Sequence, residues 1–194
     1  MLLPKEFIIF DTEYTAWKGS QERKWSLPNE HMELVQIAGY KVQKKNNNYE
    51  IIDSIDIYII PKINSKLSKY FTKLTNITNK HLLKYGISFE KGINRFSKFI
   101  NNLNCYSYGN DFTIFEENFN LYNIKNKFFN KNNFYDIKIF FDRYGINTNN
   151  YSSGSIYNSV GLNVDNVNIH NALFDSYSIL ITINHLINKG LIIK

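Results

Sequence analysis

Two acidic residues stand two positions apart near the start of the chain. In "FIIFDTEYTAW" (residues 7–17), an apolar run leads into Asp11 and Glu13. In a β-strand, residues i and i+2 point to the same face and rise about 3.3 Å each, so both carboxylates can converge on one cation. Buried like charges repel unless positive charge lies between them, and oxygen ligands favour a hard ion such as Mg²⁺. The alternative is a strand that ends in two solvated acids.

Two later segments carry side chains of the same kind. Asp111 follows the expected strand "CYSYG" (105–109), where it fits either a metal ligand at a strand end or an ordinary helix N-cap. In "HNALFDS", Asn171 is a candidate N-cap, which places Asp175 in the first turn of the last helix and His170 just before it. The helix N-terminus favours the ionised form of Asp175. A helix-start acid and a loop histidine without a role are the alternatives.

Hydrophobic patterning predicts the elements that position these residues. Strands are expected at 7–14, 32–43, 49–60, 105–109 and the first part of 133–141. Helices are expected after Pro61, at 88–103, 112–122, the second part of 133–141, 152–162 and 171–190. Because strands come first and then alternate with helices, the order predicts an α/β domain with a mixed sheet.

The distribution of charge suggests an anionic partner. The chain carries 23 basic and 17 acidic residues, a net charge of +6, which favours a partner such as nucleic acid. The stretch between Asp56 and Glu90 contains no acid but six lysines, namely Lys62, Lys66, Lys69, Lys73, Lys80 and Lys84. The first four recur at helical spacing, so a helix here is expected to carry one basic stripe. A solvated helix face is the alternative.

Length and composition bound the class of protein. A chain of 194 residues with 43% hydrophobic content suits a single domain with a sizeable core. We expect no signal peptide and no membrane helix, because charged residues interrupt every apolar run too soon. Cys105 is the single cysteine, which excludes an internal disulfide and fits a reducing compartment. We therefore expect a cytoplasmic protein without a membrane partner, and a homodimer is one candidate assembly.

In chain order, these motifs resemble those of the DEDDh exonucleases. This DnaQ-like superfamily includes RNase T, oligoribonuclease and the proofreading subunit of bacterial replicative polymerase. "FDTE", "SYGNDFTIF" and "HNALFDS" are similar to its three motifs, and "ELVQIAGYKV" and "LTNITNKHL" to its connecting segments. "DTEYTAW" looks closest to the Eri1-like branch, whose members act on RNA. The chain departs from the pattern at Asn110, where Trp is frequent, and at Asn76 and Phe174, which replace a usual Gly and a frequent Asp.

The resemblance implies a fold, a cofactor and a reaction. The fold is α/β and RNase H-like, with a five-stranded mixed sheet flanked by helices, in one exonuclease domain over residues 1–194. The reaction is the release of nucleoside 5′-monophosphates from single-stranded 3′ ends, with RNA preferred to DNA. Two Mg²⁺ or Mn²⁺ ions activate water, and His170 takes its proton. The implied metal ligands are Asp11, Glu13, Asp111 and Asp175, and the expected substrate-binding residues are Thr12, Trp17, Lys66, Lys69 and Lys73.

Other interpretations use the same residues differently. A nucleic-acid-binding or polymerase-associated subunit would show weak or no catalysis, although a pure binder has little reason to place acids where phosphates lie. A dinucleotide phosphodiesterase would keep the catalytic residues and need no basic track. Trp17 and Trp25 could stack on bases or belong to the core. The "SSGS" segment (152–155) fits either a phosphate cradle or a plain helix cap.

Overall fold

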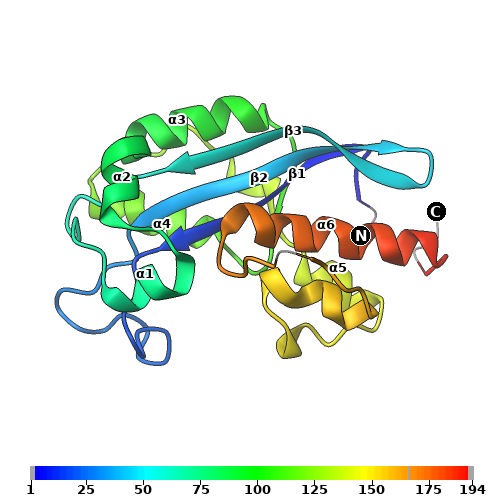
Figure 1. The fold of residues 1–194 in the computed structure, drawn as a ribbon. Helices are drawn as coiled ribbons and strands as arrows, with labels where there is room; N and C mark the ends of the chain where they lie inside the picture. The colour runs from blue at the N-terminus through cyan, green and yellow to red at the C-terminus, as the bar shows by residue number, and fades with distance from the viewer. Residues whose placement is uncertain (1–2, 166, 192–194) are drawn as a thin grey trace.

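A computed structural model describes residues 3–165 and 167–191 and contains a five-stranded sheet in the order β3-β2-β1-β4-β5 (Figure 1). β1 pairs antiparallel with β2, and β2 antiparallel with β3, whereas β4 runs parallel to β1 and to β5. The predicted five-stranded mixed sheet is therefore confirmed. The strands are β1 (Glu6–Tyr14), β2 (Leu34–Lys45), β3 (Asn48–Tyr58), β4 (Cys105–Ser107) and β5 (Phe134–Asp136).

Helices cover both faces of this sheet. One face packs against α3 and α4, and the other against α5, η3 and α6, which crosses the sheet in Figure 1. The α-helices are α1 (Lys69–Thr75), α2 (Asn79–Tyr85), α3 (Phe89–Ile100), α4 (Phe112–Leu121), α5 (Lys138–Arg143) and α6 (Ala172–Asn188). Short 3₁₀ helices are η1 (Lys131–Asn133), η2 (Thr148–Asn150) and η3 (Ser153–Val160). Among residues 3–165 and 167–191, no helix has the length and apolar character that a membrane crossing requires.

The central strand β1 sets the direction of the acidic pair. Ile8 and Phe10 join the core formed with α3 and α4, while Phe7 and Ile9 join the core formed with α5 and α6. Because successive side chains alternate between the two faces, the residues at 11 and 13 continue the face of Phe7 and Ile9. Thr12 continues the opposite face. Strand alternation thus directs both acids toward the side of the sheet that α6 covers.

The predicted basic helix after Pro61 is wrong in its extent. Helix α1 begins only at Lys69, where the Ser68 hydroxyl accepts a hydrogen bond from the Phe71 N–H group at 2.9 Å. Lys62 and Lys66 lie in irregular chain before it. The cause is a buried acid: the Glu33 carboxylate accepts hydrogen bonds from three successive backbone N–H groups, at residues 62 to 64. These contacts hold the segment in a non-helical conformation.

Candidate active site

The five residues predicted to carry the chemistry line one hollow of about 320 Å³. β1 supplies Asp11 and Glu13, the turn after β4 supplies Asp111, and α6 supplies Asp175, with His170 in the loop just before it. Asp11, Glu13 and Asp175 are 7%, 9% and 2% exposed. The fold therefore gathers, from three separate segments, the acids and the histidine that the sequence motifs singled out.

Asp111 occupies the N-cap position of α4, as one interpretation of the sequence expects, but its side chain makes no capping hydrogen bond. Its Oδ2 atom instead accepts a hydrogen bond from the Thr12 hydroxyl at 3.1 Å. The carboxylate is therefore bonded to β1 and not to the helix that follows it. Thr12, which was expected to bind substrate, also lines the hollow and links β1 to the turn after β4.

The segment that begins η3 holds Asp175. The Ser153 hydroxyl donates a hydrogen bond to Asp175 Oδ2 at 2.9 Å. Gly154 approaches so closely that an added Cβ would lie 2.3 Å from Asp175 Oδ1. Ser152 and Ser155 form a capping box, as the plain-cap interpretation expects. No local pattern in the sequence indicates the contact with Asp175, because it joins residues 22 positions apart.

His170 lies beside two of the acids. A carboxylate oxygen of Glu13, a ring nitrogen of His170 and a carboxylate oxygen of Asp175 all lie within 4.8 Å of one another. His170 has a left-handed backbone (φ 67°) directly before Asn171, whose side chain caps α6 by accepting hydrogen bonds from the N–H groups at 173 and 174. Burial lowers the pKa of His170, which favours the neutral imidazole near pH 7.

Burial raises the pKa of all four carboxyl groups. The pKa of Asp111 and that of Asp175 rise to about 7 from 3.8, although hydrogen bonds from Thr12 and Ser153 oppose the shift. The pKa of Asp11 and that of Glu13 also rise well above their ordinary values, because neighbouring carboxylates add their repulsion to the effect of burial. Ionising all four groups together therefore requires a compensating positive charge.

The donor set fits divalent cations. Among the described residues, no Lys or Arg lines the hollow, so no basic side chain there balances the acids. Asp175 Oδ1 is buried and has no hydrogen-bond partner in the described part of the chain. Carboxylate oxygens with one imidazole nearby are ligands for Mg²⁺ or Mn²⁺. The residues present therefore suit such ions.

The hollow also has an aromatic and apolar wall. Trp25 from the β1–β2 loop and Tyr70, Phe71 and Leu74 from α1 line it. Trp17, the tryptophan expected to bind substrate, lies instead in a separate hollow that it shares with Lys66. The sequence placed both tryptophans near the acids, but only the folded loop shows which of them lies beside the carboxylates.

The two lysines of α1 lie outside both hollows. Lys69 and Lys73 are exposed and do not contribute to the lining of either one, whereas their helix neighbours Tyr70 and Leu74 do. The structure therefore separates the predicted substrate-binding residues into Thr12 at the acids, Trp17 with Lys66 in the second hollow, and this lysine pair along the outer surface of α1.

Solved structures of exonucleases share this fold. One, described as "3′-end specific recognition of histone mRNA stem-loop by 3′-exonuclease", matches with a TM-score of 0.75 at 18% identity over 96% of this chain and 64% of that chain. The nuclease domain of 3′hExo, a DEDDh family member bound to rAMP, gives 0.75 at 19% identity over 96% and 93%. E. coli Exonuclease I in complex with a dA16 oligonucleotide gives 0.58 at 14% identity over 97% and 42%.

At such identities, these likenesses show a common fold. The chain spans just under two thirds of the length of the histone mRNA stem-loop-binding exonuclease, at 64%. No curated protein sequence matches this chain significantly. The family model described as "Exonuclease", RNase T, matches residues 8–181, a span that contains all five residues gathered in the hollow. This chain therefore belongs to the RNase T family of exonucleases.

Proposed function

We propose that this protein is a metal-dependent 3′–5′ exonuclease that releases nucleoside 5′-monophosphates from single-stranded ends, with RNA preferred to DNA. The observation that carries the proposal is the convergence of four carboxyl groups, three of them buried, and a histidine of lowered pKa in one hollow. Membership of an exonuclease family supports the reaction class. The preference for RNA rests on the Eri1-like "DTEYTAW" segment.

The four acids have a common role in this proposal. Asp11, Glu13, Asp111 and Asp175 would hold two Mg²⁺ or Mn²⁺ ions. Bound there, the ions would supply positive charge at the scissile phosphate and lower the pKa of the attacking water. His170 then accepts the proton of that water as a general base. Its neutral form, favoured by burial, is the form able to do so.

The surroundings of the hollow favour a single-stranded end. A terminal nucleotide must separate from its complement before it can enter a buried site, and unpairing costs a few kcal/mol. The upstream phosphates then need positive charge. In our proposal they contact Lys69 and Lys73, which are exposed on the helix that lines the hollow, and Lys66 beside Trp17. One domain over residues 1–194 would contain all of these groups.

A cleavage assay with defined ends tests the proposal. The protein is incubated with Mn²⁺ and 3′- or 5′-labelled single-stranded RNA, single-stranded DNA, duplexes and dinucleotides. We expect 3′ label to leave as a mononucleotide at once, 5′ label to give a ladder, and a 3′-phosphate to block the reaction. Cleavage of a circular substrate would indicate an endonuclease. Tight binding without cleavage would favour a binding subunit, and turnover of dinucleotides alone would favour a phosphodiesterase.

Two triple variants that remove equal charge test where the bound nucleic-acid strand runs along the protein surface. Replacing Lys66, Lys69 and Lys73 with Ala should weaken binding of long oligonucleotides and flatten its salt dependence, because each phosphate contact releases counterions. Dinucleotide cleavage should change little. The control removes three equally exposed charges on α3, which packs against the other face of the sheet (Lys91, Arg95 and Lys98). Equal effects of the two triple variants would refute this path.

A further inference from the structure

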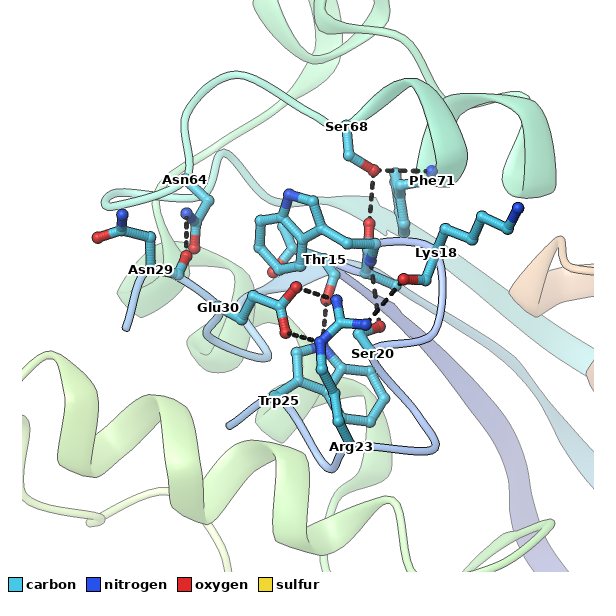
Figure 2. Close-up of polar contacts among 12 residues, drawn as sticks. Thr15, Lys18, Ser20, Arg23, Trp25, Asn29, Glu30, Asn64, Ser68 and Phe71 are labelled. Carbon is cyan, nitrogen blue, oxygen red and sulfur yellow. Dashed lines mark hydrogen bonds and ion pairs between the residues drawn. The ribbon is translucent and has the colours of Figure 1, made fainter. Parts of the chain in front are cut away.

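The β1–β2 loop and the start of α6 reach the hollow from distant parts of the chain, and they are held in different ways. The loop forms hydrogen bonds within itself, as where the Trp25 indole donates to the Thr15 carbonyl at 2.9 Å (Figure 2). The start of α6 carries Asp175, with His170 just before it, and it is bonded to a different element of the fold. That bond fixes the position of both side chains relative to the sheet.

Each backbone N–H group in the first turn of α6 has a described acceptor. The N–H group of Asp175 donates to the Asn171 carbonyl at 2.9 Å, and those of the two residues before it donate to the Asn171 side chain. The N–H group of Ala172 donates instead to Oε1 of Gln36, on β2, at 3.3 Å. Ala172 and Gln36 are both fully buried, so without this acceptor the N–H group would lose its partner out of reach of water.

The side-chain amide of Gln36 is itself held by the neighbouring strand β3. Its Nε2 atom donates to Asp56 Oδ1 at 2.8 Å and to the Tyr58 hydroxyl at 3.2 Å. The Tyr58 hydroxyl in turn donates to Asp56 Oδ2 at 3.2 Å. Because both acceptors lie on β3, the amide must turn its nitrogen toward them and its oxygen toward Ala172. A carboxylate or an apolar side chain at this position could not make both sets of bonds.

Gln36 also lies beside an acid of the hollow without lining the hollow itself. It pairs with Glu13 across β1 and β2, and directly opposite residues of antiparallel strands share one face of the sheet. On the basis of the proposed function, we infer that Gln36 is a positioning residue that fixes the start of α6 relative to Glu13. His170 lies two positions before Ala172 and Asp175 three positions after it, so both follow any shift of this anchor. A misplacement of about 1 Å in a catalytic site can lower the rate roughly 100-fold.

Amide hydrogen exchange tests this role without metal or activity. Gln36→Met keeps a side chain of similar length and removes its donors and its acceptor. The N–H groups in the first turn of α6 should then exchange roughly 10-fold faster, as expected when a buried hydrogen bond is lost, while the strands keep their protection. Gln43→Met is the matched control, because Gln43 lies on the same strand and donates to Glu6 Oε2 at 3.2 Å, at the opposite end of β1 from the acids. Unchanged exchange at Ala172, or faster exchange throughout the fold, would overturn the inference.

Kinetics and metal binding provide a second measure. Residues that orient metal ligands typically contribute 10–100-fold, so Gln36→Met should lower kcat and the calorimetric affinity for Mn²⁺ by roughly 10-fold or more, with KM for an oligonucleotide nearly unchanged. Asp56→Ala, which removes an exposed partner of Gln36, should have a smaller effect in the same direction. Wild-type kcat and Mn²⁺ affinity in folded Gln36→Met would refute the inference and leave the exonuclease proposal intact. If the first turn of α6 loosens in Gln36→Met but the wild-type protein cleaves no oligonucleotide, the exonuclease proposal fails and the role of Gln36 in placing α6 stands.

Discussion

Two groups of buried acids in this molecule have opposite surroundings. Glu33 is fully buried, and its carboxylate accepts hydrogen bonds from the N–H groups of Lys62 and Ile63 at 2.7 Å each, from that of Asn64, and from the Tyr122 hydroxyl at 2.6 Å. The protein itself therefore supplies the donors that this negative charge requires. An acid of this kind is a structural anchor.

The hollow that contains Asp11, Glu13, Asp111 and Asp175 has fewer such donors among the described residues. In the described part of the chain, side-chain hydrogen bonds to its carboxylates come from Thr12 and Ser153. Burial and mutual repulsion then raise the pKa values of the acids. The comparison teaches that burial of an acid does not by itself mark a functional site. A shortage of hydrogen-bond donors around a buried acid does mark such a site, because the negative charge then needs another group or ion to balance it.

The largest effect should come from removing an acid of the hollow. Asp11→Ala or Asp175→Ala should abolish cleavage, since each change removes a proposed metal ligand. The free energy of unfolding of the metal-free protein should stay the same or increase, because repulsion among the carboxylates falls. Activity assays and urea unfolding measure the two effects. Turnover retained by Asp11→Ala would contradict the assignment of this site.

Next in size is the effect of the proposed base. His170→Ala should lower the rate roughly 10²–10⁴-fold, the usual contribution of a general base, and should still bind metal and oligonucleotide. Single-turnover kinetics separates the chemical step from binding. His185→Ala is the matched control, because this histidine lies in the last turn of α6 and does not line the hollow. Equal rates for the two variants would place the base elsewhere.

Replacing Glu33, the structural anchor, should have the opposite effect on stability: the protein should become less stable. Glu33→Gln removes the charge that three backbone N–H groups share, so the free energy of unfolding should fall by about 2–3 kcal/mol. Tyr122→Phe, which removes one donor, should cost about 1 kcal/mol. Urea unfolding measures both, and dinucleotide cleavage by folded Glu33→Gln should match wild type. If Glu33→Gln were as stable as wild type, the contrast between the two acid groups would fail.

The last expected effect is a pH dependence that arises in the hollow. In the metal-free protein, Asp111 and Asp175 titrate near pH 7 when folded, against 3.8 for an ordinary aspartate. The folded state then holds protons that the unfolded state has lost. The free energy of unfolding should therefore fall as pH rises from about 4 to about 7. Added Mg²⁺, or Asp175→Asn, should flatten this slope in thermal unfolding.

Local signals in the sequence predicted much of the fold, while the resemblance to the exonucleases implied that the four acids converge. Strand alternation placed Asp11 and Glu13 on one face, and the buried pattern of β1 confirms the strand. The Asn171 cap fixed the start of α6 and with it the place of Asp175. The ambiguous segment at 133–141 forms a strand and then a helix, as predicted. Each of these features depends on residues only a few positions apart.

Features that depend on distant contacts were not predictable in this way. The lysine spacing after Pro61 suggested a helix, but Glu33 binds residues 62 to 64 across about 30 positions of sequence and prevents it. The contact of Ser153 with Asp175 and the placement of Trp25 in the same hollow as the acids likewise arise only when separate segments meet. No short-range pattern encodes any of the three.

The separation of the acids along the chain has a consequence for synthesis. Asp11 lies on the first strand and Asp175 on the last helix of the described fold, so the hollow cannot be complete until α6 has left the ribosome and docked. Because chains emerge N-terminus first, β1 to β3 can pair while the site still lacks one of its acids. Under the proposed function, a partly made chain would not yet cleave RNA, including the message that encodes it. Cleavage would begin only after α6 has been made and has docked.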